Sequence, residues 1–198
     1  MNWNEIAPAA ATLFLVMDPL GNMPVFNAVL SKLDPRRRSA VVARELVIAL
    51  VILLGFLFAG NAILGFLQLS QSSLSIAGGV LLFIISLRMI FPDATADEGG
   101  DVEDPFIVPL AVPLTAGPST IAFVLLLSSS QPDRLLDWSL ALVLAWAGAT
   151  ALLVASPHLL KLIGSRGSRA LERLMGMILV VLATQMLLNG IRDFVQSL

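Results

Sequence analysis

The chain contains no cysteine, a single histidine, and only 13% charged residues among its 198 positions. The absence of cysteine excludes disulfides, thiol relays and cysteine-based metal sites. The charged fraction is about half of the roughly 25% found in soluble globular proteins. With a net charge of −2 and no nucleic-acid-binding motif, no nucleic-acid partner is expected.

Hydrophobic residues are abundant instead, at 57% of the chain, and the mean hydropathy is +0.89. These values indicate an integral membrane protein. The length accommodates about six helices of roughly 20 residues and leaves no room for a soluble domain, so we expect one transmembrane domain over 1–198. Residues 1–5 carry no positive charge, which argues against a cleavable signal peptide.

The predicted fold is an all-α membrane protein with six transmembrane helices. Its apolar runs are expected at about 6–31, 44–68, 72–91, 105–130, 138–163 and 171–192. Ten of the twelve basic residues then fall on one side of the membrane, and only Arg134 and Arg192 fall on the other. The positive-inside rule predicts a multi-pass protein with both termini outside the cytoplasm.

Two similar motifs suggest an internal repeat. Pro19-Leu20 with Pro24 matches Pro113-Leu114 with Pro118 in spacing. We expect one repeat over about 1–91 and a second over about 105–198, joined by an acidic cytoplasmic linker at 92–104. Because each repeat holds three spans, the second is inverted relative to the first, as in many secondary transporters.

The prolines of these motifs predict that helices 1 and 4 are broken near the midplane, restarting near Pro24 and Pro118. Freed backbone groups are tolerated in a bilayer only where they are packed in protein or line a wet cavity. Restarting helices present N–H groups and a positive dipole end, which suit an anionic group such as a carboxylate. The expected binding residues of this small polar site are Asp18, Gly21, Asn22, Pro24, Thr115, Gly117, Pro118, Ser119 and Thr120.

Asp18 is the acidic residue inside the first apolar run, and two roles remain open for it. It can be the N-cap of a helix that starts at Pro19, because Asp followed by Pro is a favourable capping pair. It can also bind an ammonium group, a proton or a sodium ion, since ionisable residues within membranes are usually functional. The two roles are compatible.

Two segments carry a resemblance to the MarC family of bacterial and archaeal inner-membrane proteins. They are Asp18-Pro19-Leu20-Gly21-Asn22-Met23-Pro24-Val25-Phe26 and the stretch from Pro105 to Ile121 that contains Pro113-Leu114-Thr115-Ala116-Gly117-Pro118. The resemblance covers essentially the whole chain. It implies an inner-membrane location, six helices and a relationship to LysE-type amino-acid exporters. In such families a glycine often follows the Gly-Pro pair, whereas this chain has Ser119.

Together, the motifs and the resemblance imply a secondary transporter of small neutral amino acids such as glycine or alanine. Asn22 and Thr115 would bind the carboxylate with the half-helix ends, and Asp18 the ammonium or coupling ion. Without an ATP-binding motif, the energy would come from a proton or sodium gradient. Alternatives are an exporter of another small solute, a cation or an antibiotic, and a non-transporting membrane assembly subunit. No enzyme activity, metal or cofactor is expected, and a homo-oligomer stays open.

Overall fold

The computed structural model describes residues 2–31, 35–91 and 116–197. All regular structure in these residues is helical, with no strand, as the sequence predicts. The elements are α1 (Trp3–Met17), α2 (Pro19–Ser31), α3 (Pro35–Leu67), α4 (Gln71–Ile90), α5 (Pro118–Ser130), a short 3₁₀ turn η2 (Pro132–Arg134) and α6 (Leu135–Gln196).

Five segments of the described chain are long and apolar enough to cross a bilayer: Trp3–Met23, Arg44–Leu67, Gln71–Ile90, Pro132–Gly164 and Arg166–Gln196. The helix α5 is apolar but shorter, at 13 residues. These six segments are consistent with the expected number of spans. The predicted linker at 92–104 and the first part of the predicted fourth run lie outside the described residues.

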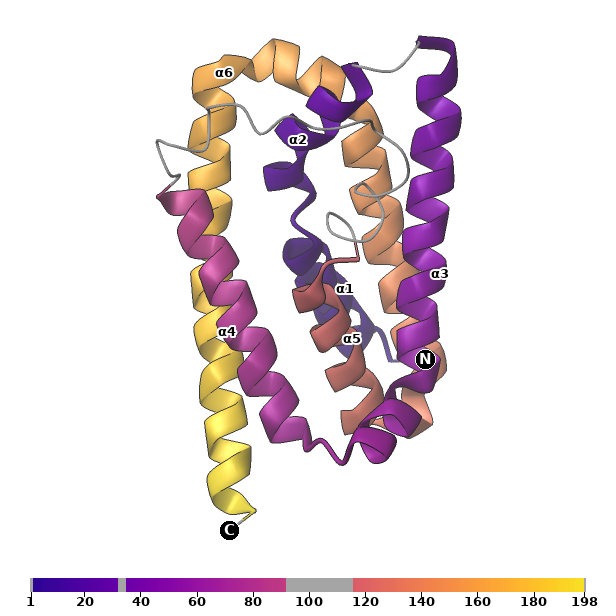
Figure 1. The fold of residues 1–198 in the computed structure, drawn as a ribbon, viewed down its shortest axis with the longest axis vertical. Coiled ribbons are helices and arrows are strands. Elements are labelled where there is room, and N and C mark those ends of the chain that lie inside the picture. The colour runs from indigo at the N-terminus through magenta and orange to yellow at the C-terminus, as the bar shows by residue number, and fades with distance from the viewer. Residues whose placement is uncertain (1, 32–34, 92–115, 198) are drawn as a thin grey trace.

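The fifth and sixth spans are separate as predicted, but a kink joins them in place of the expected loop: α6, Leu135–Gln196, consists of two helices that meet at Gly164. Gly164 alone departs from helical geometry, with φ 68° and ψ 173°, in a region of backbone conformation open essentially only to glycine. Figure 1 shows α6 turning back at one end of the molecule. Arginine, leucine, alanine and glutamate dominate the residues after Gly164 and are good helix formers, so a bend replaces the loop.

The first predicted loop is also shorter than expected. The helix α3 begins at Pro35 instead of near 44, because proline is well suited to the first helical position and the following residues tolerate helix. Residues 32–34 of the predicted connection lie outside the described residues.

Small residues bring α4 close to the second half of α6. The hydroxyl of Ser75 donates a hydrogen bond to the backbone oxygen of Met186 at 2.8 Å. A Cβ added to Gly79 would lie 3.0 Å from the backbone oxygen of Ala183. Close packing through small residues is the usual way in which helices associate within membranes. These two segments therefore form a tightly joined antiparallel pair.

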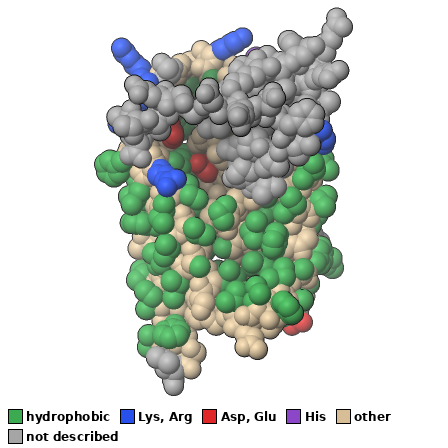
Figure 2. Space-filling view, in the orientation of Figure 1, with side chains coloured by type: hydrophobic (Ala, Val, Ile, Leu, Met, Phe, Trp, Pro, Cys, Tyr) green, Lys and Arg blue, Asp and Glu red, His purple; other side chains and the backbone are tan. Residues whose placement is uncertain are grey.

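The two ends of the molecule differ in charge. Figure 2 shows lysine and arginine side chains gathered at the end that holds the Gly164 bend. At the opposite end, Arg134 forms ion pairs with Glu5 and with Asp137, the latter at 2.9 Å, and lies 5.2 Å from the ring centre of Trp138. These contacts tie the start of α1 to the start of α6.

Candidate functional site

The first apolar run is divided at Asp18. The helix α1 ends at Met17, and Asp18 adopts the left-handed conformation with φ 45° and ψ 57°. Aspartate is among the few residues other than glycine that tolerate this region, and a residue before proline is disfavoured in the right-handed helical region. The Asp18-Pro19 pair therefore ends one helix and starts the next.

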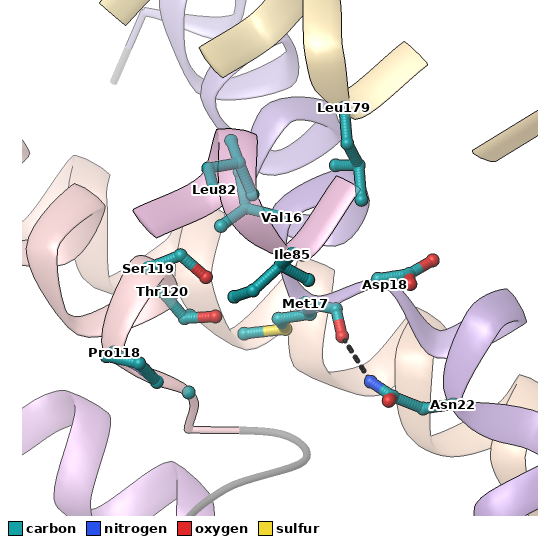
Figure 3. Close-up of a pocket in the computed structure, with 11 residues that line it drawn as sticks. Val16, Met17, Asp18, Asn22, Leu82, Ile85, Pro118, Ser119, Thr120 and Leu179 are labelled. Atoms are coloured by element: carbon teal, nitrogen blue, oxygen red, sulfur yellow. Dashed lines mark hydrogen bonds between the residues drawn. The ribbon is translucent and has the colours of Figure 1, made fainter. Parts of the chain in front are cut away.

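The Asp18 side chain caps the helix that follows. Its Oδ1 accepts a hydrogen bond from the backbone N–H of Gly21 at 3.1 Å, which is the geometry of an N-cap. The amide of Asn22 reaches back and donates to the backbone oxygen of Met17 at 3.1 Å (Figure 3). The restart expected near Pro24 is therefore wrong: α2 begins at Pro19 and runs through position 24, because Asp18 and Pro19 already supply a cap and a first position.

Gly21 makes this capping geometry possible. A Cβ at this position would collide with the Asp18 carboxylate and would lie 2.6 Å from the Cε of Met89. No side chain larger than hydrogen fits without moving these groups. Because residue 21 is glycine, the Asp18 carboxylate can fold back over the first turn of α2.

The second motif starts a helix as predicted. The helix α5 begins at Pro118 with Gly117 as its N-cap, and this cap forms no side-chain hydrogen bond. Ser119 and Thr120 are buried, at 5% and 1% exposure. Within the described residues, neither their backbone N–H groups nor their hydroxyls have a hydrogen-bond partner. Among the residues that the structure describes, no anion is hydrogen-bonded to the positive end of the α5 dipole.

The two motifs meet at one small cavity of about 80 Å³. Figure 3 shows the Asp18 junction on one side and the start of α5 on the other. The lining residues are Val16, Met17, Asp18, Asn22, Leu82, Ile85, Gly117, Pro118, Ser119, Thr120 and Leu179. A single buried water needs roughly 10–15 Å³ of such volume, so the space admits several waters or one small solute.

Six of the nine residues expected from sequence line this cavity: Asp18, Asn22, Gly117, Pro118, Ser119 and Thr120. Gly21 lies next to it on α2 and shapes the Asp18 carboxylate. Position 24 falls one turn further along α2, and its side chain is not described. Thr115 lies outside the described residues.

Sequence reasoning missed the apolar walls. Leu82 and Ile85 come from α4, and Leu179 comes from the second half of α6. Apolar residues of a membrane span give no signal that separates a cavity wall from a lipid-facing surface.

The cavity is electrically asymmetric. The C-terminal end of α1 and the Asp18 carboxylate are negative, whereas the N-terminal end of α5 is positive. The N-terminal end of α2 already holds the Asp18 carboxylate, whereas the N-terminal end of α5 has no side-chain cap among the described residues. Such a site suits a small solute with opposite charges at its two ends. In the described part of the chain, no group of three His, Cys, Asp or Glu side chains is placed to hold a metal ion.

Comparison with known proteins shows the family to which the chain belongs. The model of the "MarC family integral membrane protein" matches residues 3–195. The UPF0056 inner membrane protein YhgN of Escherichia coli K12 is 52% identical over 196 residues, which cover 98% of this chain and 100% of that protein. A UPF0056 membrane protein of Buchnera aphidicola from Schizaphis graminum is 47% identical, covering 98% and 100%.

A more distant relative extends the match to the archaea. A UPF0056 membrane protein of Methanocaldococcus jannaschii is 34% identical over 194 residues, covering 93% of this chain and 94% of that protein. No solved structure matches the chain. A family model that spans nearly every residue, with relatives aligned end to end, leaves one conclusion: the chain belongs to the MarC family of integral membrane proteins.

Proposed function

We propose that the protein is a secondary transporter of small neutral amino acids, with glycine and alanine as the substrate class. The observation that carries the proposal is the meeting of the negative end of α1 and the positive end of α5 at one small cavity. A zwitterion has the charges to match: its carboxylate faces α5 and its ammonium faces Asp18.

The carboxylate half of this site is formed by α5. A carboxylate oxygen can accept hydrogen bonds from the N–H groups of Ser119 and Thr120 and from their hydroxyls. These donors have no acceptor among the described residues and lie on the cavity wall, where hydrogen bonds to an ionised acceptor are stronger than those to a neutral one. A bound carboxylate supplies that ionised acceptor.

The ammonium half is formed by the Asp18 junction. One carboxylate oxygen of Asp18 caps α2, which leaves the other oxygen for a cation. An ammonium group, a proton or a sodium ion can each occupy this half. The ammonium group of the substrate and a coupling ion therefore compete for the single carboxylate of Asp18. That competition is a physical basis for coupling uptake to an ion gradient.

The size of the cavity favours amino acids over larger cargo. Pockets that enclose drug-sized molecules have volumes of about 300–1,000 Å³, whereas this cavity measures about 80 Å³. An antibiotic would require the walls formed by α4 and α6 to move apart. No observation favours an assembly subunit or an enzyme.

We further propose an inner-membrane location, with the Gly164 bend in the cytoplasm and both termini outside. The gathering of basic side chains at that end supports the orientation (Figure 2), and the name of the Escherichia coli relative supports the location. In this arrangement α1 and α5 belong to two inverted halves of the chain.

The test is uptake of labelled glycine, alanine and serine into proteoliposomes under imposed proton or sodium gradients. Gly117→Leu is expected to abolish uptake, because its side chain would fill the cavity beside the start of α5. Gly55→Leu is the matched control, since a Cβ at Gly55 meets nothing within 4 Å. Absence of uptake by the wild-type protein, or normal uptake by folded Gly117→Leu, would overturn the proposal.

A further inference from the structure

Two amide side chains lie on the exposed face of the second half of α6. The Nε2 of Gln185 donates a hydrogen bond to the Oδ1 of Asn189 at 2.9 Å. Both side chains are exposed, and in a bilayer exposed positions of a spanning segment face lipid. A polar pair at such a position is unusual, because hydrocarbon offers no hydrogen-bond partner.

Gln185 lies inside the hydrocarbon layer, and Asn189 lies nearer to its edge. Between Arg173 and Arg192 the helix rises about 28 Å, close to the roughly 30 Å thickness of a bilayer core. On this scale Gln185 is about 18 Å from Arg173 and about 10 Å from Arg192. Asn189 lies one turn nearer to Arg192, about 5 Å from it along the axis, so Gln185 is the deeper of the two residues.

The mutual hydrogen bond leaves part of each amide unused. An amide side chain carries one oxygen acceptor and two N–H donors. Among the described residues, the Oε1 of Gln185 and the Nδ2 of Asn189 have no hydrogen-bond partner. The pair therefore presents both a free acceptor and free donors to the lipid.

The surrounding surface is apolar and forms a single stripe. At 100° per residue, Val181, Gln185 and Leu188 lie on one side of the helix. Val181 and Leu188 are 69% and 55% exposed. Arg192 continues the stripe toward the C-terminal end of α6, where it and the neighbouring Asp193 are exposed. Figure 1 shows this half of α6 at the outer edge of the bundle, packed against α4.

We propose that a second copy of this chain packs on this stripe, forming a parallel homodimer through Gln185 and Asn189. Two copies in one membrane share an orientation, so their amides lie at the same depth. The free donor of Asn189 in each copy can then meet the free acceptor of Gln185 in the other. Any other membrane protein would need its own polar residue at that depth, whereas a second copy always has one.

The absence of cysteine in the chain permits a clean cross-linking test. Val181→Cys is expected to form an intermolecular disulfide under mild oxidation in native membranes. Val51→Cys is the matched control, because Val51 is 63% exposed on α3 and also lies about 10 Å inside the membrane from the basic end. Equal cross-linking at the two positions, or none at Val181, would overturn the proposal.

A second measurement isolates the amides. The double variant Gln185→Leu with Asn189→Leu should weaken dimerisation in liposomes about tenfold, as counted by single-molecule photobleaching, because reciprocal hydrogen bonds in membranes are individually modest. Asn61→Leu removes an exposed amide from α3 and should leave the dimer intact. A monomeric wild-type protein in liposomes, or an unaltered dimer in the double variant, would contradict the inference.

Discussion

The Oδ1 of Asp18 lies 3.1 Å from the backbone nitrogen of Gly21, from which it accepts a hydrogen bond. A carboxylate that is only 7% exposed therefore has a structural task in capping α2. Asp18 is also one of the residues that line the cavity between α1 and α5. Capping occupies one oxygen, and a ligand would use the other, so the two roles can be separated by substitution.

Replacing Asp18 with Asn should preserve the fold and abolish coupled accumulation. Asparagine and aspartate are nearly equal as N-caps, but an amide side chain carries no negative charge for an ammonium, a proton or a sodium ion. We expect an unfolding temperature close to that of the wild-type protein and loss of gradient-driven uptake, measured over a range of pH. Wild-type accumulation with an unchanged pH profile would leave Asp18 as a cap alone.

Thr120→Val should weaken substrate binding without destabilising the helix. Valine keeps the shape of threonine and removes the hydroxyl that faces the cavity. Loss of one neutral hydrogen bond, worth about 0.5–1.5 kcal/mol, should raise KM for uptake about threefold to tenfold. Thr184→Val is the control, because its hydroxyl bonds to the backbone oxygen of Val180 within the same helix. Equal effects of the two substitutions would argue against contact between Thr120 and substrate.

Gly21→Ala should destabilise the protein, because the added Cβ would collide with the Asp18 carboxylate and with Met89. Overpacking of this kind typically costs about 1–3 kcal/mol. Gly55→Ala fills open space and should be neutral or stabilising by about 1 kcal/mol through helix propensity. The measurement is the unfolding temperature of the two purified variants in the same detergent. Equal unfolding temperatures would show that the Asp18 carboxylate can move to make room for the added Cβ.

Orientation can be measured with a pair of leucines near opposite ends of the first half of α6. Leu136 and Leu162 are 82% and 86% exposed. In intact cells with a permeabilised outer membrane, a membrane-impermeant thiol reagent should label Leu136→Cys and spare Leu162→Cys. Background labelling is absent, since the chain has no cysteine. The reverse pattern would place the Gly164 bend outside the cytoplasm.

Sequence was informative wherever backbone chemistry leaves few options. Asp18-Pro19 and Gly117-Pro118 gave the helix boundaries that place two polar segments at one cavity. The restart near Pro24 was wrong because Asp18 and Pro19 already supply the cap and the first position of α2. The walls from Leu82 and Leu179 could not be identified, since their faces depend on how whole helices pack.

The Gly164 bend has a consequence for how the protein is made. A single non-helical residue separates Pro132–Gly164 from Arg166–Gln196, so no free loop exists between these two spans. We expect the two spans to leave the ribosome and enter the bilayer together as a helical hairpin. The arginines that follow the bend would stay on the side of the membrane where the ribosome is. The last third of the protein would then be inserted as one unit, after the earlier helices are in place to receive it.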